Sequence, residues 1–213
     1  MSLGFKSYQP VGLRLWHWIN SFAIGGLLLT VLLHKTFLSP KKTSILIQEK
    51  LTESNFNVDA DTVRSIARVL RDRMFDWHYY FGFLLTGVFL FRIFVAIQQR
   101  DFPWRQAWVG AKQFRQAKAP EKRGHFHFTA VKFGYLTFYV AVLMMILTGL
   151  PMYFSKALSI TRDMRHTLQD IHGFFLWYFV GFIVLHVAGV IFAELGAHRG
   201  IISNMIHGGE KKP

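Results

Sequence analysis

The chain has 213 residues, of which 52% are hydrophobic, and a formal net charge of +13 at pH 7. So apolar a composition, with its charges gathered beside long apolar stretches, excludes an ordinary soluble domain and argues against a nucleic-acid-binding protein. Cysteine is absent, which excludes disulfides, thiolate-held iron–sulfur clusters and covalently attached haem in this chain.

Four segments are long and apolar enough to cross a bilayer whose hydrocarbon core is about 30 Å thick. In chain order they are residues 11–34, 77–98, 128–153 and 170–195. Charged residues such as Arg92 and Lys132 stand only near the ends of these spans. We therefore predict an all-α integral membrane protein, a four-transmembrane-helix bundle that forms one domain over residues 1–213.

Two shorter helices are expected outside the spans. Apolar residues recur at helical spacing ahead of the second span, which predicts an amphipathic helix over about 59–76, capped by Asp59 or Asp61. This helix either shields a nearby site from water or docks a partner protein, and both roles stay open. The segment from Gly200 to Gly209 predicts a short interfacial helix at the carboxyl end.

The basic residues predict the orientation in the membrane. The loop from Gln99 to His127 carries seven Lys and Arg against two acidic residues, whereas the loop from Lys35 to Asp76 carries eight against six. Because basic loops favour the cytoplasmic side, the later loop is placed inside, together with both termini. We therefore expect a membrane protein that crosses the bilayer several times.

The fourth span carries the most informative pair of residues, His172 and His186. They are fourteen residues apart, which on an α-helix is about 21 Å along the axis and a return to within about 40° of the same face. Both side chains therefore point one way at two depths of the bilayer. Imidazole is a common axial ligand of haem iron, and ionisable groups inside membranes are usually functional. The alternative is a hydrogen-bonded, structural histidine.

Two further histidines lie at matching depths. With the amino terminus inside, His17 falls near the inner end of the first span and His78 at the outer end of the second. His17 lies at the same expected depth in the bilayer as His186, and His78 at the same depth as His172. This pairing is the same for either orientation of the protein across the membrane. We predict two b-type haems with these four residues as iron ligands. His34 competes with His78 for the outer level. The other histidines are expected at the interfaces: His125, His127, His166, His198 and His207.

Two arginines lie near the predicted inner pair. Arg14 is three residues before His17, and Arg92 is fourteen residues after His78, at the inner end of the second span. Haem propionates are anionic and favour the forked donors of a guanidinium group. Either arginine therefore binds a propionate of the inner haem or extends to the lipid headgroups.

Several of these segments together resemble one family. The segment from Arg14 to Trp18, the spacing of His78 and Gly82, and the spacing of His172 and His186 are similar to those of bacterial di-haem b-type cytochromes. That family includes the cytochrome b subunits of nickel–iron hydrogenases, the gamma subunits of formate dehydrogenases and bacterial cytochrome b-561-like proteins. The resemblance covers nearly the whole chain, from Val11 to Gly209.

The third span and the carboxyl end refine the resemblance. Gly124 and His125 are similar to a Gly-His pair that opens the third span of hydrogenase cytochromes, and the segment from Glu194 to Gly208 looks like the same branch. One departure stands out: Phe126 and His127 follow where an Asn-Pro pair is usual. This departure weakens the assignment to hydrogenase and leaves the expected haem ligands unchanged.

The resemblance implies a function. An iron–sulfur or cytochrome subunit of a membrane-bound dehydrogenase or hydrogenase, on the outer face, would exchange electrons with the outer haem. The inner haem would reduce menaquinone or ubiquinone at a site for which His125, Arg92 and Lys132 are the candidates. The implied location is the bacterial inner (cytoplasmic) membrane, crossed several times. The chain would then be a non-catalytic, membrane-anchoring electron-transfer subunit, with two haem b groups as cofactors and no catalytic residues of its own.

Two rival functions remain at this point. The first is a stand-alone, quinone-linked cytochrome b that oxidises a small reductant such as superoxide. The second is a haem-free transporter or proton channel that uses the histidines as a relay. Activity of the isolated protein separates the first from the electron-transfer subunit, and the colour of the purified protein tests the second.

Overall fold

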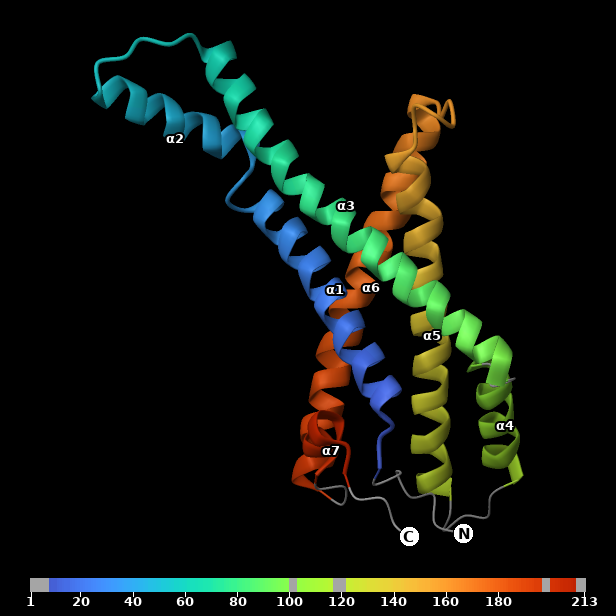
Figure 1. Ribbon diagram of the computed structural model, residues 1–213. Helices are drawn as coiled ribbons and strands as arrows, with labels where there is room; N and C mark the ends of the chain where they lie inside the picture. The colour runs from blue at the N-terminus through green and yellow to red at the C-terminus, as the bar shows by residue number, and fades with distance from the viewer. Residues whose placement is uncertain (1–7, 100–102, 117–121, 197–199, 210–213) are drawn as a thin grey trace. The chain divides into compact units, whose positions relative to one another are not determined.

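The structure is a computed structural model that describes residues 8–99, 103–116, 122–196 and 200–209 (Figure 1). Within these ranges all the regular structure is helical, as predicted. The helices are α1 (Val11–Lys35), α2 (Pro40–Glu53), α3 (Ala60–Gln99), α4 (Pro103–Gln116), α5 (Lys122–Tyr153), α6 (Arg162–Leu195) and α7 (Ile201–His207).

Four of these helices, α1, α3, α5 and α6, are long and apolar enough to cross a membrane. They contain the four predicted spans, which confirms the predicted all-α, four-helix membrane fold class. Large apolar side chains stay exposed along them, for example Phe174, Leu185 and Phe192 on α6. Lipid tails solvate such side chains as well as a protein core does, so an apolar outer surface carries no penalty in a bilayer.

The observed helices extend beyond the predicted spans. The helix predicted over 59–76 and the span over 77–98 form one unbroken helix, α3, of 40 residues. In addition, α5 begins at Lys122 and α6 at Arg162, several residues before the predicted starts at 128 and 170. Hydropathy locates only the apolar part of a helix. The backbone hydrogen bonds continue into polar flanks until a cap ends them, as Thr161 does for α6 by accepting a hydrogen bond from the Met164 amide.

Two observed helices, α2 and α4, were not predicted. Each has 14 residues, and each begins at a proline, Pro40 or Pro103. Proline suits the first turn of a helix because it has no amide hydrogen to leave unsatisfied. Both helices mix apolar with basic residues, so a search for long apolar windows passes over them. The predicted carboxyl-terminal helix within 200–209 is present as α7.

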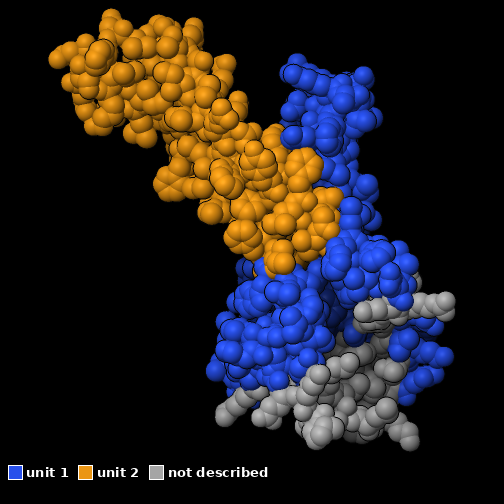
Figure 2. Space-filling model, viewed as in Figure 1, with its two compact units in different colours: residues 1–18, 89–213 blue, residues 19–88 orange. Residues whose placement is uncertain are grey.

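The chain divides into two compact units, residues 1–18 with 89–213 and residues 19–88, which Figure 2 colours separately. The division falls within α1 and α3, and each unit is described by itself. In the first unit α5 packs against α4 and α6, and α7 packs against α6. Phe138 of α5 is buried, with its ring centre 5.8 Å from that of Phe179 and 5.1 Å from that of Phe182, both on α6. These aromatic contacts join α5 to α6.

In the second unit α1 approaches α3 closely at Gly26. A Cβ atom added at Gly26 would lie 2.6 Å from Cζ of Phe81 and 2.7 Å from two further ring atoms. The same Phe81 ring meets Phe22 edge-on, with centroids 5.5 Å apart. Any larger residue at this position would therefore force the Phe81 ring or the two helices to shift.

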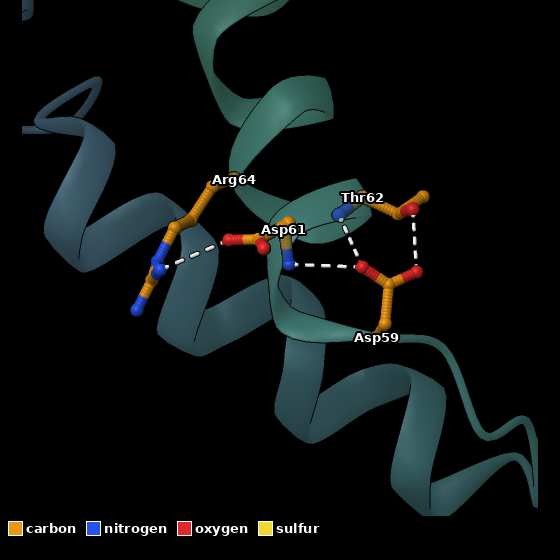
Figure 3. Close-up of polar contacts among 4 residues, drawn as sticks. All are labelled: Asp59, Asp61, Thr62 and Arg64. Atoms are coloured by element: carbon orange, nitrogen blue, oxygen red, sulfur yellow. Dashed lines mark hydrogen bonds and ion pairs between the residues drawn. The ribbon is translucent and has the colours of Figure 1, made fainter.

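Asp59 caps the amino-terminal end of α3 (Figure 3). Its carboxylate accepts hydrogen bonds from the amides of Asp61 and Thr62, at 3.1 and 2.9 Å, and from the Thr62 hydroxyl at 2.6 Å. Asp61 instead forms an ion pair with Arg64 at 3.1 Å. Of the two predicted caps, the structure therefore has Asp59. The hydrogen bonds from Thr62 also lower the pKa of Asp59 below its ordinary value.

Replacing Asp59 with alanine is expected to loosen the first turn of α3. The Asp61 and Thr62 amides lose their acceptor, so their hydrogen–deuterium exchange should become faster. Acid should act in the same way, because a carboxylate with a lowered pKa stabilises the fold above about pH 3.9 and loses this contribution as the pH falls through its folded-state pKa. Asp61→Asn is the matched control, and equal exchange in both variants would refute the capping role.

Candidate functional site

The imidazole rings of His17 and His186 lie beside each other in the first unit. Their centroids are 6.2 Å apart and their planes are tilted by 47°. His17 lies in the second turn of α1, and His186 lies in the carboxyl-terminal third of α6. The two residues come from opposite ends of the sequence, and the fold brings together two histidines that the sequence analysis paired.

The His17–His186 pair fits a metal ion between its rings. A transition metal binds an imidazole nitrogen at about 2 Å, so two such bonds, with the distances from each nitrogen to its ring centre, require centroids about 6 Å apart. The observed separation of 6.2 Å meets this requirement. Two imidazole nitrogens are also a donor set that haem iron takes from a protein. The chemistry and the spacing of the pair therefore fit haem iron.

A ladder of aromatic rings along one face of α6 orients His186. Phe182, one turn earlier, stacks on the imidazole with centroids 6.0 Å apart and planes within 3°. Tyr178, another turn earlier, stacks on Phe182 at 6.0 Å. The Tyr178 hydroxyl donates to Oγ1 of Thr137 on α5, at 2.9 Å. This chain of contacts restricts the rotation of the His186 ring through its neighbours.

The short helix α7 holds the start of α1. The Trp18 indole nitrogen donates to the Met205 carbonyl at 3.2 Å, and the Arg14 guanidinium donates to the Ile206 carbonyl at 2.7 Å. At the other end of α7, the Glu194 carboxylate accepts hydrogen bonds from the Gly200 and Ile202 amides. Arg14 and Trp18 lie on either side of His17 in the sequence, so these bonds fix the turn of α1 that carries this histidine.

Arg92, a predicted propionate or quinone contact, lies in a cluster beside the His17 turn. Its Nε donates to the Tyr139 hydroxyl at 2.9 Å, and its guanidinium carbon lies 5.8 Å from the centre of the Trp16 ring. The Trp16 and Tyr139 rings are nearly parallel, 6.3 Å apart. Since Trp16 immediately precedes His17, the structure places Arg92 with the neighbour of a predicted iron ligand.

The other two candidates for a quinone site are less fully described. Lys132 on α5 has its ammonium nitrogen 5.8 Å from the centre of the Tyr135 ring, a cation–π contact one turn away. His125 lies in the first turns of α5, and its side chain falls outside the described part of the structure. Of the three candidates, Arg92 is therefore the one that the structure joins to described partners beside His17, namely Tyr139 and Trp16.

His78, in the second unit, contacts a threonine on the neighbouring helix. Its Nδ1 lies 2.9 Å from Oγ1 of Thr30 on α1, and this hydroxyl also lies 2.7 Å from the Leu27 carbonyl of its own helix. His34, the competing residue, is four residues further along α1 and meets Phe75 edge-on at 4.7 Å. Both histidines therefore lie at the interface between α1 and α3. Of the two, His78 is the one in contact with the Thr30 hydroxyl.

His172, in the first unit, has the same kind of contact. Its Nδ1 lies 2.8 Å from Oγ1 of Thr148 on α5, and this hydroxyl lies 2.7 Å from the Met144 carbonyl. The next residue of α5 is also close, because a Cβ atom added at Gly149 would lie 3.3 Å from Cε1 of His172. Sequence reasoning missed Thr30 and Thr148. The available signal was a lone hydroxyl residue within an apolar span, which does not by itself distinguish a histidine contact from a bond to the backbone.

Comparison with protein families shows that the family model described as prokaryotic cytochrome b561 matches residues 8–208. The chain belongs to this family. Membership confirms the predicted resemblance to bacterial b-type cytochromes and identifies a multi-pass, haem-b-binding membrane protein of electron transfer. Searches of curated proteins and of solved structures gave no match.

Proposed function

We propose that this cytochrome anchors a larger oxidoreductase to the bacterial inner membrane and passes electrons through two b haems between a partner subunit and the quinone pool. Membership of the prokaryotic cytochrome b561 family supports the electron-transfer role. The observation that carries the proposal is the close approach of His17 and His186, whose ring centres are 6.2 Å apart. This pair comes from two predicted membrane spans, as a buried haem requires.

In this proposal His17 and His186 bind one haem, and His78 and His172 bind the other. When bound, each haem supplies reversible one-electron exchange at its iron. The chain would supply the imidazole nitrogens that hold each haem, and its apolar helices would keep water from the iron, which tunes the potential. The ladder of Tyr178 and Phe182 supports the first pair by restricting the ring of His186.

For the quinone, the cluster around Arg92 is the favoured site. A quinone presents two carbonyl oxygens, which accept hydrogen bonds and gain negative charge on reduction. The Arg92 guanidinium and the Tyr139 hydroxyl are donors suited to such an oxygen, and Trp16 offers a ring face. Their position beside the His17 turn supports quinone reduction near the haem of that pair. Lys132 and His125 are further candidates, and the quinone is menaquinone or ubiquinone.

For the partner, we propose an iron–sulfur or cytochrome subunit of a dehydrogenase or hydrogenase, docked on the outer face at α2 and the first turns of α3. This segment carries exposed charges of both signs, including the ion pairs of Arg64 with Asp61 and Lys50 with Glu53. Exposed charges suit reversible recognition of another protein, because they steer association. Both termini are then cytoplasmic, as the basic loop between α3 and α5 indicates.

The first experiment is a haem count on the purified protein. In detergent, we expect a dithionite-reduced minus oxidised spectrum of b type and two haems per chain by pyridine haemochrome extraction. A quinol analogue should reduce these haems, whereas superoxide should not do so faster than it reduces a control b-type cytochrome. A protein without haem, from cells with adequate haem supply, would overturn the proposal in favour of a transporter. One haem per chain would mean that one histidine pair is misassigned, and fast oxidation of superoxide would favour the stand-alone cytochrome.

A further inference from the structure

The two histidines proposed to share the second haem have the same neighbour. Oγ1 of Thr30 lies 2.9 Å from Nδ1 of His78, and Oγ1 of Thr148 lies 2.8 Å from Nδ1 of His172. The first contact joins α1 to α3 within one compact unit, and the second joins α5 to α6 within the other. In each unit, therefore, Nδ1 of a histidine contacts the hydroxyl group of a threonine on another helix of that unit.

Each threonine hydroxyl also has a second contact, which determines the direction of the first. Oγ1 of Thr30 lies 2.7 Å from the Leu27 carbonyl, and Oγ1 of Thr148 lies 2.7 Å from the Met144 carbonyl. A carbonyl oxygen only accepts hydrogen bonds, and a hydroxyl has one proton to donate. Once that proton is donated to the carbonyl, the hydroxyl oxygen is an acceptor for the imidazole. Both bonds of each threonine are then made when Nδ1 carries the histidine proton.

The position of this proton has a consequence for iron binding. A neutral imidazole with its proton on Nδ1 has its metal-binding lone pair on Nε2. A hydrogen bond from Nδ1 to an outer acceptor also fixes the ring orientation and makes the ligating nitrogen more basic. Both threonines are largely buried, with 5% and 3% of their surface exposed, so water does not readily replace them as acceptors.

We propose that Thr30 and Thr148 are the positioning residues of the haem bound by His78 and His172. Each accepts the Nδ1 proton of its histidine, directs Nε2 toward the iron and strengthens that nitrogen as a donor. A stronger donor stabilises ferric iron over ferrous iron and so lowers the midpoint potential. The inference rests on the proposed function, since it assumes that these two histidines bind the same haem.

Potentiometric titration of the full-length protein in detergent tests this role. Thr148→Val keeps the shape of the side chain and removes the acceptor, so the reduced form of one haem should be favoured about tenfold more, which is about 59 mV for a one-electron couple. The potential of the other haem should stay unchanged. Thr148→Ser restores the hydroxyl and should restore the wild-type potential.

A matched control is available on α3. The Thr86 hydroxyl donates to the Gly82 carbonyl at 2.8 Å, as the other two do to their own helices, and no described contact joins it to a histidine. Thr86→Val should therefore leave both potentials unchanged. Equal shifts in Thr148→Val and Thr148→Ser, or in Thr148→Val and Thr86→Val, would attribute the effect to packing and overturn the proposal. If Thr148→Val loses haem, retention of both haems in Thr148→Ser supports the proposal, and loss there overturns it.

Thr30→Val supplies an independent test on the other helix pair. It should raise the potential of the same haem as Thr148→Val does, and the double variant should affect that haem alone. Shifts in two different haems would overturn the assignment of both threonines to one haem. Unchanged potentials in both single variants, with two haems bound, would overturn the positioning role and leave the proposed function standing. A wild-type protein without two haems would instead fail the proposed function before any variant is compared.

Discussion

Replacing His186 with alanine is expected to lower the haem content from two haems per chain to one. Its ring centre lies 6.2 Å from that of His17, and alanine would remove one of the two imidazole nitrogens proposed to hold that haem. Haem held by a single histidine in a membrane site binds more weakly, and loss of it during purification should be nearly complete. Pyridine haemochrome extraction measures the ratio, and the reduced spectrum reports which b haem remains.

Two further variants test whether a loss of haem in His186→Ala reports the loss of an iron ligand. His17→Ala should remove the same haem, so the variant lacking both histidines should lose no more than either single variant. His166 is an exposed residue on α6, the helix that carries His186, and His166→Ala should keep both haems. Retention of two haems in His186→Ala would refute the ligand assignment. Loss of haem in His166→Ala would show that the method reports general damage to α6.

Gly26→Ala is expected to destabilise the protein even though alanine favours a helix. The added Cβ would lie 2.6 Å from Cζ of Phe81, so α1 and α3 must separate or the ring must move. Overpacking of this kind costs about 1–3 kcal/mol, which exceeds the gain of up to about 1 kcal/mol in helix propensity. The measurement is the thermal unfolding midpoint in detergent, which should fall.

The neighbouring glycine is the control for this prediction. A Cβ atom at Gly25 would meet no atom within 4 Å, so Gly25→Ala should leave the midpoint unchanged or raise it. Gly26→Ala in a Phe81→Leu background should cost less than in the wild type, because the ring atoms that it meets are absent. Equal effects of Gly25→Ala and Gly26→Ala would contradict the close approach of α1 and α3 at this point.

The membrane spans could be predicted because hydropathy and length are properties of the sequence itself. All four predicted spans lie within observed helices, and the predicted carboxyl-terminal helix is present as α7. The helices α2 and α4 were missed because each has only 14 residues and a mixed polarity. The continuity of α3 across the predicted boundary at 76 and 77 also follows from backbone hydrogen bonding, which hydropathy does not report.

The part of the candidate site that could be predicted is the part that depends on the spacing of residues along single helices. The spacing of His172 and His186 and the order of the spans gave the levels of the four histidines, and His17 and His186 do lie together. The pairing of His78 with His172 stays a prediction. Arg14 was expected either at a haem propionate or at the lipid headgroups, and in the structure its guanidinium donates to the Ile206 carbonyl of α7. That contact joins residues 192 positions apart, and no local pattern indicates it.

Composition, helical period and the charge beside the spans depend on the chain alone, and they were enough to predict an all-helical membrane protein with histidines spaced for two levels. Which side chains meet depends on how the helices pack. The tertiary structure placed Thr30 on His78 and Thr148 on His172, Gly26 under Phe81, and α7 against the start of α1. Such contacts depend on the rotation and separation of neighbouring helices, which are set by the packing of both partners and are encoded in neither segment alone.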